Sequence, residues 1–155
     1  MDITVKEIDA PQLDCSSEEI VILPHNYQAD EGYEYHSTTI SFYKYSRDKL
    51  DIKYLTEPEL LVEQRSGDWF GPLLFISSSA LLQNPELVSI MCGVIANYVT
   101  DFFKSSDKPN IRLKVIHKET KTSKLTEISY EGGLEGLDKL EESINRVVSK
   151  SKKDE

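Results

Sequence analysis

The sequence has few cysteines, and their spacing does not suggest a disulfide framework or a zinc site. Only Cys15 and Cys92 occur in 155 residues, the first in a polar stretch and the second in an apolar one. We therefore expect free thiols and a reducing, cytoplasmic location. The three histidines, His25, His36 and His117, also lack metal-binding spacing, and we interpret each as a surface or strand-end residue. We predict that the fold needs no metal and no other cofactor.

Long hydrophobic runs are absent as well. The longest apolar stretch, from Leu87 to Phe103, is interrupted by polar residues that include Asn97 and Asp101. This makes it a poor membrane span. The N-terminal residues have neither the basic nor the apolar region of a signal peptide. We therefore expect a soluble protein without a membrane span.

Basic residues are scarce near the N-terminus. Residues 1–35 contain nine acidic side chains and one basic side chain, Lys6, so they carry −8 of the net charge of −9. A nucleic-acid-binding protein needs a basic face that displaces counterions, so this balance argues against nucleic acid and anionic lipid as partners. We favour a solvated segment that aids solubility. The alternative is an arm that docks on a basic partner.

Length and composition indicate one globular domain. The chain is 39% hydrophobic and 29% charged, and no linker or internal repeat divides it. We predict a single α+β domain over residues 19–149. An acidic, flexible segment over residues 1–18 precedes it, and a frayed polar tail over residues 150–155 follows it.

Several segments have the patterns of β-strands. Two apolar runs, 20–23 and 73–76, predict buried strands. Two pairs of segments alternate apolar and polar residues around a turn, which predicts two β-hairpins. The hairpins cover 37–43 with 50–54, and 111–115 with 124–130. We also expect a short strand over 60–64 and a loop over 67–72.

The most regular helical pattern covers residues 85–104. Asn84 is a good N-cap, and Pro85 suits the first helical position. The apolar stripe is wider than usual, so this helix must be covered on more than one side. A second helix is expected to begin near Leu134, after two glycines that end the preceding strand. We predict an α+β fold in which both helices pack on one face of an antiparallel or mixed sheet.

No motif indicates catalysis. Residues 77–79 are serines before a helix, but the sequence shows neither the glycine-flanked turn nor the histidine base that a serine nucleophile needs. Residues 132–136 depart from phosphate-binding spacings, and acidic neighbours would repel a phosphate there. We assign no catalytic, cofactor-binding or metal-binding residue. A third interpretation is an enzyme whose site is assembled from residues far apart in the sequence. It would need a cleft that holds His36 or His117 beside a carboxylate.

The aromatic residues suggest two functions. The only tryptophan, Trp69, stands beside Phe70, and the pair could anchor an interface or, as we favour, fill the core. We predict a non-enzymatic interaction or adaptor domain of an intracellular assembly, bound to a protein partner or to a second copy. Its candidate surface residues are Trp69, Phe70, Tyr33, Tyr35, Val99 and Phe103. The alternative is a small-molecule-binding domain with an aromatic pocket between sheet and helices. The candidate lining residues of that pocket are Tyr33, Tyr35, Tyr43, Trp69 and Tyr98.

Overall fold

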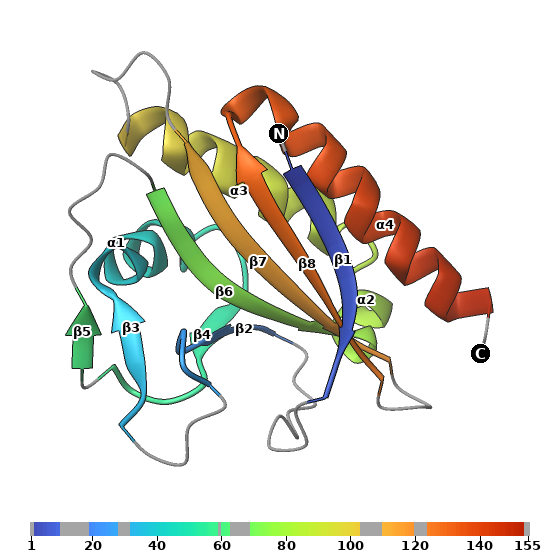
Figure 1. Cartoon of the computed structure of the whole chain (residues 1–155), viewed down its shortest axis with the longest axis horizontal. Helices are drawn as coiled ribbons and strands as arrows, with labels where there is room; N and C mark the ends of the chain where they lie inside the picture. The colour runs from blue at the N-terminus through green and yellow to red at the C-terminus, as the bar shows by residue number, and fades with distance from the viewer. Residues whose placement is uncertain are drawn as a thin grey trace.

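The computed structural model describes residues 2–9, 19–27, 32–58, 60–62, 69–102, 110–119 and 124–153 (Figure 1). Its elements follow one another in the order β1 (Asp2–Ile8), β2 (Ile20–Leu23), β3 (Glu34–His36), α1 (Ser37–Ser46), β4 (Ile52–Tyr54), β5 (Leu60–Val62), β6 (Trp69–Ser77), α2 (Ser78–Gln83), α3 (Leu87–Phe102), β7 (Ile111–Lys118), β8 (Leu125–Gly132), a 3-10 turn (Leu134–Gly136) and α4 (Leu137–Lys153). Within these ranges no helix is long and apolar enough to cross a membrane.

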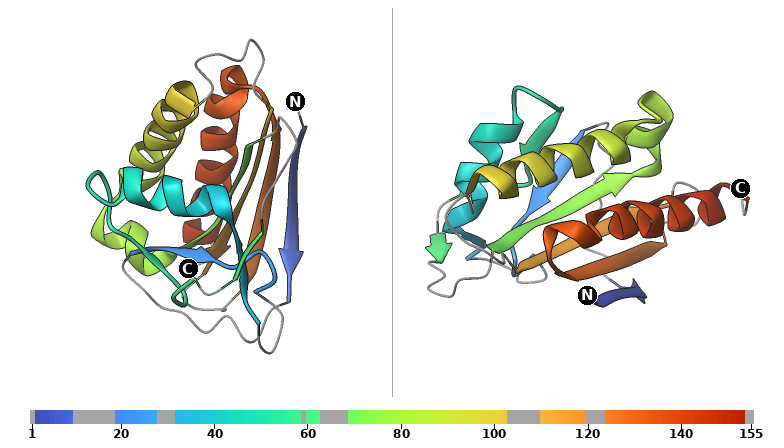
Figure 2. Two further views of the ribbon diagram at one scale, coloured as in Figure 1. Left: turned by 90° about the vertical axis from the view of Figure 1, so that its left-hand side faces the viewer. Right: turned by 90° about the horizontal axis from the view of Figure 1, so that it is seen from above.

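A six-stranded mixed sheet forms the centre of the protein, in the order β1-β8-β7-β6-β2-β4. Strands β3 and β5 form a small parallel sheet beside it. Helices α3 and α4 lie behind the large sheet in Figure 1 and stay on one side of it in both views of Figure 2. The predicted mixed sheet with two helices on one face is therefore confirmed. The hairpin of β7 and β8 is also confirmed, because the two strands pair antiparallel along their whole length.

The hairpin predicted from residues 37–43 and 50–54 is wrong, although its second segment does contain a strand, β4 (Ile52–Tyr54). Residues 37–46 form helix α1, and its buried residues Thr39, Phe42 and Ser46 have the i, i+3, i+7 spacing of one helical face. The β-branched and aromatic residues of this segment favour a strand, but packing against the core overrides that preference. The topology gives the reason, since β4 pairs parallel with β2. Parallel neighbours cannot be joined by a tight turn, and α1 lies in the connection between them.

The loop predicted over residues 67–72 is also wrong from residue 69 onward, while 67 and 68 lie outside the described residues. Trp69 begins β6, and the pairing of β6 with β7 is irregular between Phe70 and Leu73. A β-bulge accommodates the glycine and the proline that indicated a loop. A Cβ atom at position 71 would lie 2.9 Å from Cδ1 of Leu113 and 3.2 Å from the Trp69 ring, so any residue larger than glycine would require these side chains to shift.

The long helix α3 starts close to the predicted position. The Asn84 side chain accepts a hydrogen bond from the Glu86 amide at 3.2 Å. The backbone carbonyl of Asn84 accepts a second one from the Leu87 amide at 3.1 Å. Val88 and Val99, which flank the main apolar stripe, are buried within the chain. Helix α2 was not expected from the sequence. The Ser77 hydroxyl caps it by accepting a hydrogen bond from the Ala80 amide.

Regular secondary structure extends towards both ends of the described chain. Residues 2–8 form the edge strand β1, which pairs antiparallel with β8, and residues 150–153 continue α4. Residues 10–18 and 154–155 lie outside the described part. Most side chains of β1 are exposed, although Ile3 and Ile8 are partly buried.

A chain that begins at Glu19 tests whether residues 1–18 are needed for folding. We expect it to keep a cooperative thermal transition at a lower melting temperature, because β1 is an edge strand that contributes little to the core. Circular dichroism at several protein concentrations measures the transition. Precipitation, or loss of the transition, would show that the segment is part of the folding unit.

Candidate functional site

The two faces of the large sheet differ in chemistry. Side chains alternate along each strand, so Leu113 and Val115 of β7 point towards α3 and α4, while Arg112 and Lys114 point to the opposite face. On that opposite face one end carries a small apolar cluster. Its buried members are Val21, Leu23, Leu73, Phe75, Ile116 and Leu125. The other end is polar and is not covered by α3 or α4.

A cavity of about 380 Å³ lies over this polar end. Its floor is formed by β6, β7, β8 and β1, and its wall by the connection between β2 and β3, by β3 and by the start of α1. The polar floor residues are Asp2, Thr4, Arg112, Lys114, Glu127, Ser129 and Glu131. The ring-bearing wall residues are His25, Tyr27, Tyr35 and His36. Figure 1 shows this face of β7, β8 and β1 turned towards the viewer.

Hydrogen bonds hold the histidine wall in place. The rings of His25 and His36 stack with their centroids 4.8 Å apart, and His25 Nε2 lies 3.2 Å from a carboxylate oxygen of Glu34. Asn26 ties the connection together, because its side chain accepts from the Glu34 amide and donates to the Gly32 carbonyl. Burial, together with the neighbouring His25, lowers the pKa of His36. The wall therefore presents a neutral His36 ring at neutral pH.

Charged groups on the floor are paired with one another. The Glu127 side chain is only 7% exposed, and its two oxygens lie 3.3 Å from Lys6 Nζ and 3.8 Å from Lys114 Nζ. Arg112 and Glu131 form a second pair at 3.3 Å. Burial raises the pKa of the Tyr27 hydroxyl, and the nearby charge of Glu127 raises it further.

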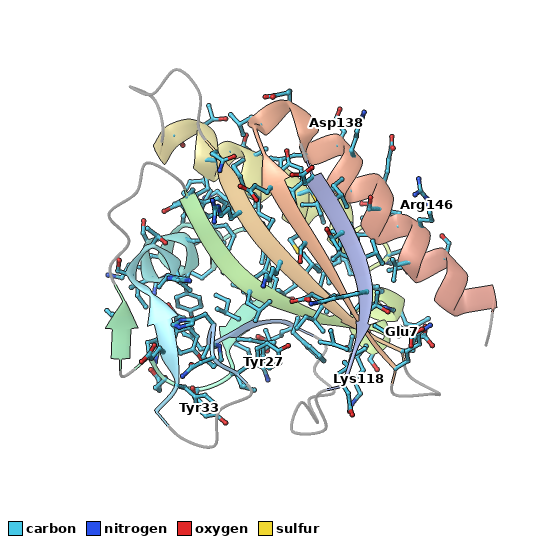
Figure 3. All side chains as sticks on the ribbon, viewed as in Figure 1. Glu7, Tyr27, Tyr33, Lys118, Asp138 and Arg146 are labelled. Carbon is cyan, nitrogen blue, oxygen red and sulfur yellow. The ribbon has the colours of Figure 1, made fainter. Side chains whose placement is uncertain are left out.

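Tyr27 joins the wall to the floor. It lies on the connection between β2 and β3, close to the lower part of the large sheet in Figure 3. Its ring packs against the small apolar cluster, and burial raises the pKa of its hydroxyl, with the nearby carboxylate of Glu127 adding to the rise. The site can therefore offer a ligand aromatic surface, apolar surface and charges of both signs within one cavity.

The predicted surface residues are largely inside the protein. Trp69 and Val99 are both 0% exposed, and the Trp69 ring packs between Phe42 and Tyr98, with centroids 5.9 and 5.3 Å away. The favoured interpretation of Trp69 as a core residue agrees with this position. Tyr35 is also buried, and its hydroxyl donates a hydrogen bond to the Thr56 carbonyl at 2.9 Å.

The other candidates are spread apart. Tyr33 is partly buried on the connection between β2 and β3, and Tyr43 packs against Tyr54. Phe103 and the side chain of Phe70 lie outside the described residues. Aromatic side chains fill the space between sheet and helices where we expected a pocket, and the cavity lies on the other face. Of the five expected lining residues, Tyr35 contributes to it.

The fold brings together a serine and a histidine that the sequence did not connect. Ser78 follows β6, and His117 is the next-to-last residue of β7. These strands are parallel neighbours, which leaves the Ser78 Oγ 3.3 Å from the His117 Nε2. The Ser78 hydroxyl also donates to the Lys118 carbonyl at 3.1 Å. Because a hydroxyl has one hydrogen and the carbonyl can only accept, we assign the Nε2–H of His117 as the donor to Ser78.

This tautomer makes the pair a structural link between α2 and β7. Burial lowers the pKa of His117, while the charge of Glu119 opposes that shift. The unprotonated Nδ1 of His117 finds no hydrogen-bond partner in the described part of the chain. The base of a serine nucleophile needs the opposite arrangement, in which Nε2 accepts the serine proton and a carboxylate holds Nδ1–H.

Metal-binding side chains do not gather elsewhere in the structure. Among the described residues, no three or more histidine, cysteine, aspartate or glutamate side chains are placed to hold a metal ion. Cys92 is a free, buried thiol whose pKa is raised to about 12 by burial and by Glu141. Cys15 lies outside the described residues. The polar cavity therefore remains the best candidate site.

Comparison with known proteins gives no further information about the site. Comparisons with protein-family models, with curated proteins and with solved structures each gave no match.

Proposed function

We propose that the protein binds a small polar molecule in the cavity on the open face of the large sheet. The cavity itself is the observation that carries this proposal. Its volume of about 380 Å³ falls within the range of small-molecule sites, and polar side chains from β1, β7 and β8 converge on it. The proposal keeps the small-molecule alternative but moves the pocket to the face opposite α3 and α4.

The lining is suited to recognition. Lys114 and Arg112 are held by carboxylates of β8, and the ring of His25 is held by Glu34 and by stacking on His36. Groups that are already oriented lose little conformational freedom when a ligand binds. The one serine–histidine contact described above lies among residues that do not line this cavity. We therefore propose binding, without a chemical step.

The interaction or adaptor function remains a prediction. A large contiguous apolar patch on a protein surface often marks a protein-binding site. The large exposed apolar side chains of the described residues come from four different elements: Val5, Leu61, Leu82 and Ile90. Trp69 and Val99, two of the residues predicted to anchor a protein partner, are buried inside the chain. We also propose a reducing, cytoplasmic location, which the buried thiol of Cys92 supports.

Replacing Ser129 with tryptophan tests the binding site. Ser129 lies on β8 between Thr4 of β1 and Lys114 of β7, so an indole at this position occupies the cavity. A fragment library is screened by amide chemical shifts on the native protein. We expect bound fragments to move the signals of Lys114 and Ser129, and we expect the Ser129→Trp variant to lose these fragments.

The matched control is Ser89→Trp, which places the same side chain at an exposed position on α3. Both variants should keep the native circular dichroism spectrum, and the control should bind fragments as the native protein does. If fragments bind equally to Ser129→Trp, or if their shifts map away from this face, the proposed site is wrong.

A further inference from the structure

The charged groups of the cavity follow the register of the strands. Arg112 of β7, Glu131 of β8 and Asp2 of β1 are direct neighbours across the sheet. Lys114 and Ser129 form the next row on the same face. Residues two apart on a strand point to the same side and lie about 6.6 Å apart along it. The rows therefore place different charges at defined positions in one cavity.

One side of the cavity borders a cationic group. Lys114, which lines the cavity, and Lys6, which lies outside its lining, share the single carboxylate of Glu127, so the three side chains together carry a net charge of +1. The hydroxyls of Ser129 and Thr4 lie in the same row as Lys114. An ammonium beside hydroxyl donors is suited to a carboxylate, because charge-assisted hydrogen bonds are stronger than neutral ones.

The adjoining part is anionic. Asp2 and Glu131 lie opposite each other on β1 and β8, and Arg112 pairs with Glu131, so the group has a net charge of −1. Like charges on directly opposed residues destabilise a sheet. A ligand ammonium placed between these two carboxylates would relieve their repulsion.

We propose, building on the small-molecule binding proposed above, that the ligand is a small zwitterion of the amino-acid class. Its carboxylate lies at Lys114 and Ser129, and its ammonium group lies at Asp2 and Glu131. The two sites occupy adjacent rows, a separation that one small molecule can span. A simple anion or a simple cation would satisfy one group and be opposed by the other.

The apolar and aromatic lining of the cavity indicates an apolar or aromatic side chain on this zwitterion. Leu23, Pro72 and Leu73 supply apolar surface, and the rings of His25 and Tyr27 border the same cavity. Planar rings favour contact with one another through stacked or edge-on arrangements. Amino acids with large apolar side chains should therefore bind more tightly than glycine or serine.

Calorimetric titration with the twenty free amino acids tests this inference. We expect binding by those with apolar or aromatic side chains. The N-acetyl derivative of the tightest ligand removes its positive charge, and the amide derivative removes its negative charge. Each should bind at least about tenfold more weakly, which corresponds to about 1.4 kcal/mol.

Two variants assign the ends of the ligand. With Lys114→Gln the preference for the free carboxylate over the amide should disappear, and with Glu131→Gln the preference for the free amine over the N-acetyl form should disappear. The matched controls are Lys53→Gln and Glu142→Gln, at exposed positions away from the cavity. If both variants lose the same amount of affinity for every derivative, Lys114 and Glu131 have a purely structural role, and the assignment of the two ends is overturned.

The results separate this inference from the proposed function. If no free amino acid binds at millimolar concentration but fragments still bind and are lost in Ser129→Trp, the zwitterion inference fails and the cavity remains a binding site. If acetylated or amidated derivatives bind as tightly as the zwitterion, the inference also fails. If Ser129→Trp has no effect on any bound molecule, the proposed function itself is wrong.

Discussion

Replacing Val99 with aspartate is expected to abolish cooperative folding. Val99 is 0% exposed in the last turn of α3, inside the main core. A carboxylate at this position would be buried without a partner, at a cost of several kcal/mol. The total stability of a domain is only about 5–15 kcal/mol. Thermal and urea melts followed by circular dichroism should show no native transition.

The control is Asn97→Asp, which adds the same charge on the exposed side of the same helix and should melt almost as the native protein does. Light scattering on the Val99 variant distinguishes the remaining cases. A folded variant of lower mass would place Val99 at an interface between chains and would support the interaction function. A variant with unchanged melting temperature and mass would show that Val99 is exposed.

Replacing Trp69 with alanine is expected to cause the second large loss of folding stability. The ring lies at the centre of an aromatic cluster with Phe42 and Tyr98, and it is 0% exposed. Removing a buried tryptophan costs about 3–5 kcal/mol. For a chain of this size the melting temperature should fall by roughly 6–20 °C. Urea denaturation measures the free energy of unfolding directly.

A second variant, Trp69→Phe, tests whether the indole Nε1 has a hydrogen-bond partner. The indole Nε1 finds no hydrogen-bond acceptor among the described residues, and an unsatisfied buried donor costs about 1–3 kcal/mol. Phenylalanine removes this donor and keeps most of the aromatic contact. We therefore expect it to lower the free energy of unfolding by less than half as much as alanine does. A loss as large as that of alanine would show that the Nε1–H does have a partner in the folded protein.

Elements with strong local signals could be predicted from the sequence. Asn84 and the apolar stripe that follows it predicted α3, and alternation around a short turn predicted the hairpin of β7 and β8. The two apolar runs became β2 and part of β6. In each case neighbouring residues in the sequence decide the outcome, because capping, turn formation and periodic burial are local properties.

The segment over residues 37–46 could not be assigned in this way. Its apolar residues alternate like those of a strand, and they also occur at helical spacing, so both structures bury a similar set. The parallel pairing of β2 with β4 decides between them, and that pairing joins residues about 30 positions apart. Long-range contacts of this kind are invisible to local patterns.

The candidate site depended even more on the tertiary structure. By itself, the sequence determined an acidic α+β domain with one face of its sheet covered by two helices, because composition, capping and periodicity are properties of neighbouring residues. Only the folded chain brought Asp2 beside Glu131 and placed Lys114 near Glu127. It also turned His25 and His36 over the open face. Strand order and register decide which charges meet, because a shift of one residue would point every one of these side chains to the other face of the sheet.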